Sequence, residues 1–295
     1  TRSSSVTGVQ TCALPISLEE DLGAAARRAV AVAPALIASR DYPPPTVAWR
    51  TGPGWLNAWL WKAERFVGAL LLKKSLNAMR AELGLPPVND LVKHLIEGAP
   101  AVNAVDEGVF PPSPSWQRRT PYANFLYFDD PMPLDPTLAA WLDEGPPPVY
   151  VGFGSMSGKG PDRVGAMIMD AVQATGLRCV VGAGWAGLGA GALPAGWRVV
   201  REAPHALLFP RMAAVVHHGG SGTTGQALRA GVPQVVLPLI LDQFHHAHLL
   251  YVAGLAPRPI RMEKITAPQL TAAIQAALAL PAGPRQAVAS RLRAS

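Results

Sequence analysis

The sequence has 295 residues, 49% hydrophobic and 16% charged, a composition that excludes a mainly disordered chain and allows two ordinary domains. Its formal net charge of +6 comes from arginines and lysines scattered along the chain. Because no basic block interleaves with aromatic residues, the charge argues against nucleic-acid binding and favours an anionic ligand or an acidic lipid surface. The two cysteines, Cys12 and Cys179, exclude a disulfide framework, so we expect a cytoplasmic protein, with peripheral contact at a membrane as an alternative.

The first 17 residues do not read as native protein. Residues 6–16, VTGVQTCALPI, match the in-frame translation of a common sequencing-adapter read. Residues 1–17, Cys12 included, are therefore excluded from the expected fold. The same observation predicts that the natural gene starts upstream and that this sequence is truncated at its amino-terminal end.

Two helices are predicted in the first half of the chain. An alanine-rich helix is expected over Leu18–Arg40, before a run of prolines. A longer helix is expected over Trp55–Leu83, interrupted by Gly68 and ended by Gly84. Its apolar residues recur at helical spacing, which favours a helix packed on a core, although the run Leu70-Leu-Leu-Lys-Lys also suits a membrane surface.

The tryptophans at positions 55, 59 and 61 of that helix allow two interpretations. They suit packing against a neighbouring helix, and they also suit an aromatic surface for an acceptor. Short strands are expected after the helix, at Ala101–Val105 and Asn124–Phe128.

A proline-rich stretch over residues 131–147, around a short helix at Leu138–Leu142, is expected to link two domains with restricted flexibility. After it, short apolar strands alternate with helices, which predicts a parallel sheet with helices on both faces. Ligands of such sheets bind beyond the carboxyl ends of the strands. The strands are expected at Val149–Phe153, Arg178–Val181, Trp197–Glu202, Ala214–His217 and Gln234–Pro238, and the helices at Asp162–Ala174, Thr223–Ala230, Phe244–Val252 and Pro268–Leu280.

The stretch Val215–Gln243 carries the strongest binding signal. Its first strand ends in His217 and His218, and the turn Gly219-Gly-Ser-Gly-Thr-Thr224 leads into a helix. The N–H groups at the start of such a helix and the positive end of its dipole attract anions, which predicts a phosphate site. Since neighbouring strand residues face opposite sides, at most one histidine points at the ligand. We expect this to be His218, with His217 packed and hydrogen-bonded.

Further polar residues are expected at the same edge of the sheet. Ser155 follows the glycine turn after the first strand of the second domain, where its hydroxyl suits a phosphate or simply closes the turn. Gln226 lies one helical turn past the glycine-rich turn and suits a ribose hydroxyl. Asp242 and Gln243 end the next strand and suit the hydroxyls of a sugar.

Two other patterns are interpreted without a ligand. The G-x-G-x-x-G pattern at residues 182–187 does not open a helix, so a dinucleotide site is not expected there. His245, His246 and His248 have no carboxylate or cysteine at ligand spacing, so no metal site is expected. We expect these histidines to form the solvated first turn of a helix.

Several ordered motifs resemble the nucleotide-sugar-binding domain of family 1 glycosyltransferases, above all the sterol glucosyltransferases and the bacterial glycopeptide and macrolide glycosyltransferases. They are PPVYVGFGSM at 147–156, APH at 203–205 with LFPR at 208–211, HHGGSGTT at 217–224, and GVP at 231–233 with PLILDQ at 238–243. The resemblance covers roughly residues 76–280. It implies an α/β chain of GT-B type with two Rossmann-like domains, the first incomplete: a partial acceptor domain over residues 18–130 and a donor-binding domain over residues 148–295.

The resemblance also implies roles for individual residues. His218 would contact the donor phosphates, beside the cradle formed by Gly220, Ser221, Gly222 and Thr223 and beside Ser155. The backbone from Ala203 to His205 would line the nucleobase, while Asp242 and Gln243 would hold the transferred sugar. Two positions depart from many relatives: Glu202 stands where they carry tryptophan, and Gln226 stands where they carry a ribose-binding glutamate.

The implied activity is inverting transfer of a hexose from a UDP- or dTDP-sugar to a hydroxyl of a lipophilic acceptor, such as a sterol, a lipid or another natural product. It needs neither a cofactor nor a metal, because the helix N-terminus and His218 stabilise the leaving diphosphate. The family's basic histidine precedes every histidine of this chain, the first of which is His94. We therefore expect the sequence to bind donor without catalysis. A nucleotide-sugar epimerase and a non-catalytic nucleotide-sugar-binding module are the alternatives.

Overall fold

The computed structural model describes residues 29–31, 34, 37–90, 101–116, 120–127, 131–154, 161–182 and 194–294. Its contacts divide the chain into two compact units. One contains Leu126–Leu239 and His246–Ser295, and the other contains the described residues up to Phe125 together with Ile240–His245. Among the described residues, no helix has both the length and the apolar character needed to cross a bilayer.

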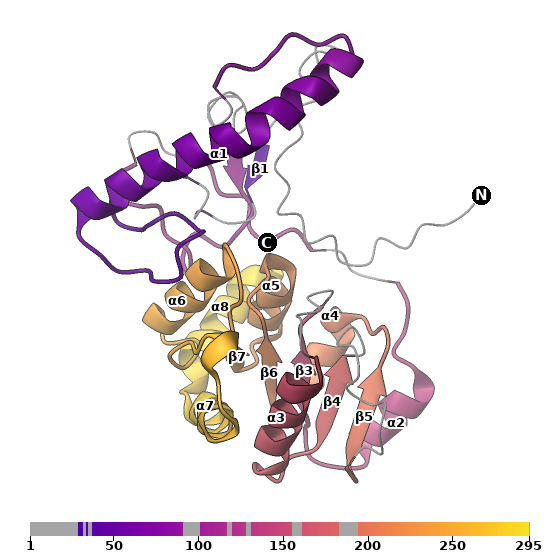
Figure 1. Ribbon diagram of the computed structural model, residues 1–295. Helices are drawn as coiled ribbons and strands as arrows, with labels where there is room; N and C mark the ends of the chain where they lie inside the picture. Colours follow the sequence, from indigo (N-terminus) through magenta and orange to yellow (C-terminus); the bar gives the residue numbers. More distant parts are fainter. Residues whose placement is uncertain are drawn as a thin grey trace. The chain divides into compact units, whose positions relative to one another are not determined.

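The unit that begins at Leu126 is built on a five-stranded sheet in the order β5-β4-β3-β6-β7, with every neighbouring pair parallel (Figure 1). The predicted strands are all present within two residues of their expected ends. Short helices at His205–Leu208 (α4) and Phe209–Arg211 (η3) and a final helix at Ala282–Ala294 (α8) were not predicted. The bounds are β3 Val149–Gly152, α3 Pro161–Gln173, β4 Cys179–Gly182, β5 Trp197–Val200, β6 Ala214–His217, α5 Ser221–Ala230, β7 Gln234–Val236, α6 Gln243–Val252, η4 Met262–Lys264 and α7 Ala267–Ala279.

The order in which strands are added to the sheet reverses between the parallel neighbours β3 and β6. From β3 the chain proceeds through β4 to β5 on one side, and then returns to place β6 and β7 on the other. In open parallel sheets, the crevice at such a reversal is where ligands bind. The carboxyl ends of β3 and β6 therefore mark the expected binding edge, and Gly152 pairs with His217 there.

The two faces of the sheet carry separate apolar cores, as expected for strands whose side chains alternate. Val149 and Val151 pack with α3 and α7, whereas Tyr150 between them packs with α2 (Pro136–Asp143), α4 and α5. Helices therefore cover both faces, as predicted, and fix the strand ends that carry the glycine turns.

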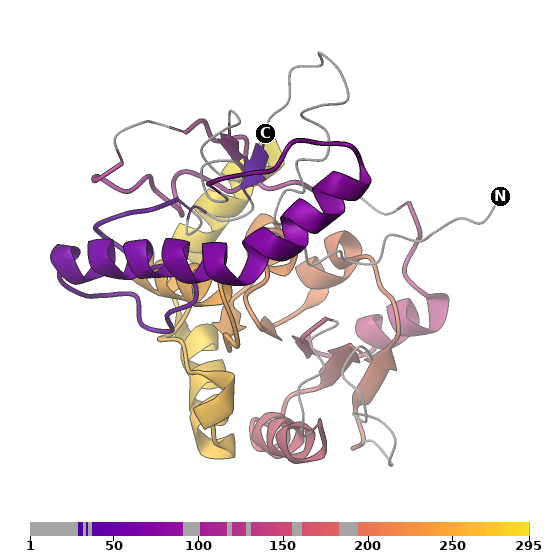
Figure 2. The same ribbon diagram turned by 45° about the horizontal axis from the view of Figure 1, so that its top comes forward.

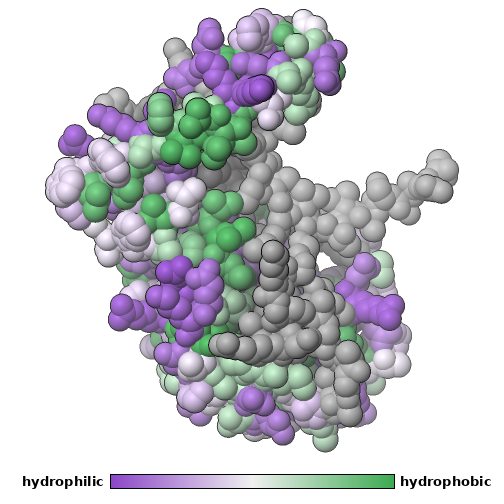
Figure 3. Space-filling model, in the orientation of Figure 1, coloured by the Kyte–Doolittle hydropathy of each residue, from purple (hydrophilic) through white to green (hydrophobic). Residues whose placement is uncertain are grey.

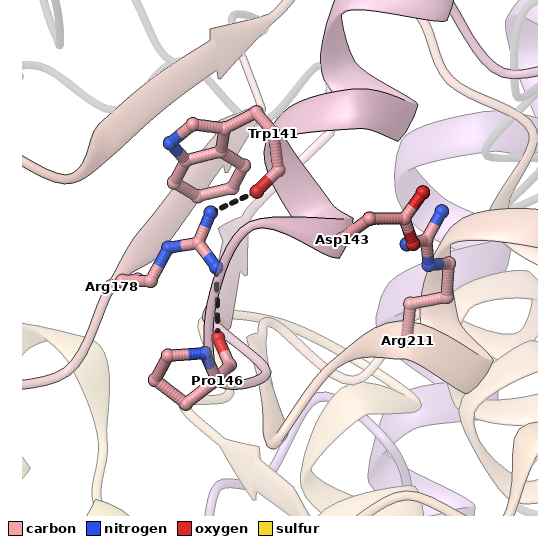
Figure 4. Close-up of polar contacts among 5 residues, drawn as sticks. All are labelled: Trp141, Asp143, Pro146, Arg178 and Arg211. Carbon is pink, nitrogen blue, oxygen red and sulfur yellow. Dashed lines mark hydrogen bonds and ion pairs between the residues drawn. The ribbon is translucent and has the colours of Figure 1, made fainter.

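Helix α2 is held to this unit by arginines on both sides (Figure 4). The guanidinium of Arg178 stacks 3.7 Å from the ring of Trp141 and donates to the carbonyl oxygens of Trp141 and Pro146. Arg211 forms an ion pair with Asp143 at the end of the helix. Leu138, Trp141 and Leu142 on its inner side are buried, so α2 packs on the sheet instead of lying free in the proline-rich stretch.

The last helix, α8, supports α5. Helix α5 ends at Gly231, whose φ of 71° places it in the left-handed region that favours glycine. The side chain of Gln286 on α8 donates to the Gly231 carbonyl oxygen at 3.2 Å, and Arg293 donates to the carbonyl oxygen of Arg229 at 3.0 Å. The carboxyl end of α5 is therefore capped by α8.

The second unit contains the parallel strands β1 (Ala29–Ala31) and β2 (Ala101–Asn103) and the long helix α1 (Gly54–Glu82). The helix predicted over Leu18–Arg40 is wrong for Ala29–Ala31, because pairing with β2 overrides the helical preference of alanine. The predicted strand at Asn124–Phe128 is also wrong for residues 124–127: only Tyr122 bridges Asn103, and Asn124 has a φ of 62°.

Helix α1 is continuous through Gly68 (Figure 2), and Gly84 closes it as predicted, after the last helical residue Glu82 and the C-cap Leu83. The N–H of Gly84 donates to the Ala81 carbonyl oxygen at 3.1 Å and that of Leu85 to the Arg80 carbonyl oxygen at 2.9 Å, the pattern of a glycine C-cap.

The expected core face of α1 is wrong. Its buried residues are Asn57, Trp61 and Arg80, and Trp61 donates its indole N–H to the Tyr42 carbonyl oxygen at 3.0 Å. The apolar residues expected to pack are exposed instead, and Figure 3 shows apolar surface gathered over the middle of the helix. The exposed fractions are 73% for Trp55, 59% for Trp59, 71% for Phe66, 70% for Leu70, 41% for Met79 and 54% for Leu83.

Candidate functional site

Two glycine turns meet where β3 and β6 end. Gly154 follows β3 with a φ of 59°, and Gly219 follows β6 with a φ of 93°, so both backbones adopt a conformation that other residues rarely take. The pairing of Gly152 with His217 brings the two turns to the same edge of the sheet. The predicted binding turn therefore lies at the reversal of strand order.

His217 belongs to the scaffold, as expected. It is fully buried, its Nε2 lies 2.9 Å from the Gln234 side-chain oxygen, and its Nδ1 accepts the N–H of Gly219 at 3.1 Å. Burial, the largest cause, together with the neighbouring His218, lowers the pKa of His217 to about 3. The imidazole is thus neutral at neutral pH and ties β6 both to β7 and to the glycine turn.

His218 lies between the two glycine turns. A Cβ atom built on Gly220 would stand 2.5 Å from its Nε2, and one built on Gly154 would stand 3.7 Å from its Cε1. The side chain is 3% exposed, and burial lowers its pKa to about 4, with His246 as a smaller cause. A neutral imidazole is therefore held against Gly220, the N-cap residue of α5.

The start of α5 exposes backbone donors. Gly220 is the N-cap, no side chain caps the helix, and the first internal bond runs from the Thr224 N–H to the Gly220 carbonyl oxygen at 2.9 Å. The N–H groups of the three residues before Thr224 have no acceptor within an α-helix. These residues, Ser221, Gly222 and Thr223, are at least partly exposed, and Gln226 one turn later is partly exposed too. The geometry suits an anion at this helix end.

The turn is supported from below by a residue that sequence reasoning did not identify. His246 on α6 is fully buried, and its Nδ1 lies 2.7 Å from the Gly219 carbonyl oxygen. The prediction of a solvated first turn is therefore wrong for His246 and also for His245, which is 2% exposed. The signal available in the sequence was their position directly after Asp242 and Gln243, two residues expected at the binding edge of the sheet. In the described part of the chain, no three His, Cys, Asp or Glu residues are grouped to hold a metal ion.

The segment Ala203–His205 follows β5 and leads into α4. The His205 imidazole stacks on Phe209 with 4.3 Å between ring centroids, and the residue is partly buried. The role predicted for this segment, lining the nucleobase, uses its backbone groups. The position of the His205 side chain does not test that role, which stays a prediction.

Three predicted residues are not joined to this geometry. Ser155 lies outside the described residues. Asp242 and Gln243 fall in the segment Ile240–His245, which groups with the other unit. There the Gln243 side-chain oxygen accepts the N–H of Ile240 at 3.1 Å, and Leu241 adopts a φ of 51°. Their contact with a sugar stays a prediction.

Comparison with known proteins shows what the chain is similar to. Residues 167–295 match the family described as "Erythromycin biosynthesis protein CIII-like, C-terminal domain". The vancomycin aglycone glucosyltransferase of Amycolatopsis orientalis is 43% identical over 175 residues, 58% of this chain and 41% of that protein. The glycosyltransferase GtfC of the same organism is 35% identical over 258 residues, 83% of this chain and 62% of that protein. Sterol 3-beta-glucosyltransferase UGT80B1 of Arabidopsis thaliana is 40% identical over 137 residues, 46% of this chain and 22% of that protein. The chain thus matches less than two thirds of each relative.

Solved structures show the same fold. The glycosyltransferase VinC in complex with dTDP has a TM-score of 0.56 at 22% identity, covering 82% of this chain and 59% of that one. A UDP-glucose: anthocyanidin 3-O-glucosyltransferase in complex with UDP has a TM-score of 0.56 at 17% identity, covering 70% and 52%. Residues 167–295 therefore resemble an EryCIII-like C-terminal domain, the chain has the α/β fold of GT-B glycosyltransferases, and its relatives include glycopeptide and sterol glycosyltransferases.

Proposed function

We propose that this chain binds a nucleoside diphosphate sugar at the amino-terminal end of α5, and that it belongs to an enzyme transferring the sugar to a hydroxyl of a lipophilic acceptor. The observation that carries the proposal is the position of His218, enclosed by Gly154 and Gly220 beside the N–H groups of Ser221–Thr223. Relatives named as glucosyltransferases, and similar structures solved with UDP and dTDP, support the same ligand class.

The diphosphate would lie on the helix N-terminus. Backbone N–H groups and the positive end of the α5 dipole offset its charge without a metal ion. Because His218 is neutral in the unliganded protein, it would donate one N–H to a phosphate oxygen. A bound anion would also raise the pKa of His218, so donor binding would take up a proton as the pH falls.

In the proposed reaction, a base removes the proton of an acceptor hydroxyl. The hydroxyl oxygen forms a bond to the anomeric carbon while the bond from that carbon to the diphosphate oxygen breaks. Charge then develops on the leaving diphosphate, where the α5 N-terminus and His218 would stabilise it. Asp242 and Gln243 are proposed to hold the sugar, Gln226 the ribose and Ser155 the phosphates.

The acceptor is proposed to be lipophilic. Support comes from the exposed apolar residues of α1, chiefly Trp55, Trp59, Phe66 and Leu70, and from relatives named for a sterol and for the vancomycin aglycone. The same surface would be the point of any peripheral contact with a membrane. Co-sedimentation with phosphatidylcholine vesicles, with and without an anionic lipid, tests that contact directly.

The donor site is tested by calorimetric titration with UDP and dTDP. The wild-type chain is expected to bind one or both, and His218→Ala is expected to weaken binding by about tenfold or more, because a hydrogen bond to a charged group is lost. His248→Ala on α6 is the matched control and should bind as the wild type does. Equal affinity of His218→Ala and the wild type would refute the site.

Transfer is tested separately. The family resemblance implies a histidine base that would precede His94, the first histidine of the chain. We therefore propose that this chain binds donor but transfers no sugar. The assay incubates UDP-glucose with a sterol or a glycopeptide aglycone and follows UDP release. Product formation by this chain would overturn the binding-only proposal, and conversion of the donor sugar without acceptor would indicate an epimerase instead.

A further inference from the structure

The hydroxyl of Tyr150 occupies the space beside two strand-end glycines. Tyr150 lies on β3, and its side chain runs along the sheet toward the carboxyl ends of β3 and β4. A Cβ atom on Gly152 would stand 2.3 Å from the hydroxyl oxygen, and one on Gly182 would stand 2.8 Å from it. Any larger residue at these strand ends would therefore displace the phenol.

The same hydroxyl contacts the segment that follows β5. It lies 3.3 Å from Nε2 of His205, and the two rings meet edge to face with 5.6 Å between centroids. Phe209 completes the cluster, 5.1 Å from the Tyr150 ring and stacked on His205. Burial raises the pKa of Tyr150 to about 12 and lowers that of His205 to about 4, so both partners are neutral at neutral pH.

This contact fixes backbone as well as side chains. His205 is the first residue of α4, and the N–H groups of Leu207 and Leu208 donate to the Pro204 carbonyl oxygen at 3.0 and 2.9 Å. The turn after β5 is thus tied to the strand ends through one pair of side chains.

We propose that Tyr150 is a positioning residue for base recognition: through His205 it holds the backbone of Ala203–His205 where that backbone reads the nucleobase of the donor. The inference rests on the proposed donor site. It separates two parts of that site, because Tyr150 would act on the base whereas His218 and the start of α5 act on the diphosphate.

The test uses the full chain and compares UDP with GDP, which share the ribose and diphosphate but differ in the base. Tyr150→Phe removes only the hydroxyl and keeps the ring contact with Phe209. Tyr251→Phe, an exposed tyrosine on α6, is the matched control. Thermal melting of each variant reports whether the fold is kept, and calorimetry gives the two dissociation constants.

The wild type is expected to prefer UDP, and Tyr150→Phe is expected to reduce that preference by about tenfold or less, the effect of one hydrogen bond, mainly by weakening UDP. His205→Gln should reduce it similarly, and the double variant should add little to either, since both act through one contact. An unchanged preference, an equal loss for both nucleotides, or a wild type that binds both equally would overturn the inference. A wild type that binds none of UDP, GDP and dTDP would refute the proposed donor site instead.

Discussion

The Nδ1 atom of His246 lies 2.7 Å from the carbonyl oxygen of Gly219, so α6 holds the glycine turn that leads from His218 into α5. Both groups are buried. Leaving a buried carbonyl oxygen without a donor destabilises the fold by more than the hydrogen bond itself contributes to stability. The shape of the candidate phosphate site therefore depends on a histidine that is not proposed to touch the ligand.

His246→Leu is expected to destabilise the protein by about 1–3 kcal/mol, because the Gly219 carbonyl oxygen loses its partner. UDP affinity should fall with it, since the turn loses its support. His246→Asn places an amide N–H near the position of Nδ1 and should recover most of both losses. Urea denaturation and calorimetry measure the two effects, and equal damage by Leu and Asn would contradict the hydrogen-bonding role.

Gly220→Ala is expected to disturb His218, because the new Cβ would stand 2.5 Å from its Nε2. The imidazole must shift, so the melting temperature should fall and UDP binding should weaken by about tenfold. Gly222→Ala is the matched test of stability: a Cβ there has no atom within 4 Å, and alanine favours the helix. Its melting temperature should equal or exceed that of the wild type, and an equal loss in both variants would contradict the steric argument.

Stability is expected to fall as the pH is lowered from about 7.5 to about 5. The pKa values of His205, His217 and His218 are lowered to about 4, 3 and 4, mainly by burial, whereas an unfolded histidine titrates near 6.5. Between these values the unfolded chain binds more protons, so the stabilisation is complete above pH 6.5 and is lost as the pH falls toward the folded values, by up to about 1.4 kcal/mol per pH unit for each histidine.

Thermal melts across this range measure the slope. His217→Asn keeps an acceptor for the Gly219 N–H but does not titrate, so it should reduce the slope by about one proton. A melting temperature that does not change with pH would contradict the burial of these groups.

Donor binding is expected to be independent of divalent cations. The candidate phosphate site offers helix N–H groups and imidazoles and no cluster of carboxylates within the described residues. Calorimetric titrations of UDP in EDTA and in millimolar Mg²⁺ should agree within about twofold. Tenfold weaker binding in EDTA would show that a metal ion takes part.

Much of the architecture of the unit that begins at Leu126 follows from local sequence. Runs such as Val149–Gly152 and Ala214–His217 are short, mostly apolar and soon followed by a glycine-containing turn, so their strands and the turns after them could be predicted. The glycine that ends α1 and the one that ends α5 were recognisable for the same reason. The packed, hydrogen-bonded position of His217 could be predicted because adjacent strand residues face opposite sides.

What could not be predicted depends on residues distant in sequence. The strand at Ala29–Ala31 forms only because β2 lies beside it, and the exposed face of α1 depends on which side its neighbours cover. His246 meets Gly219 across 27 positions, and Tyr150 meets His205 across 55. Hydrophobic periodicity carries no information about either pair.

The cap that α8 places on α5 has a practical consequence for anyone shortening or tagging this protein. Gln286 and Arg293 donate hydrogen bonds to the carboxyl end of α5, the helix whose amino-terminal end is proposed to bind the diphosphate. A deletion from Ala282 onward would remove no proposed ligand contact. The carboxyl end of α5 would nevertheless lose its cap and fray. Chains shortened there should lose nucleotide affinity because α5 is less rigid, and a ligand-binding defect in them would say nothing about the residues at the site itself.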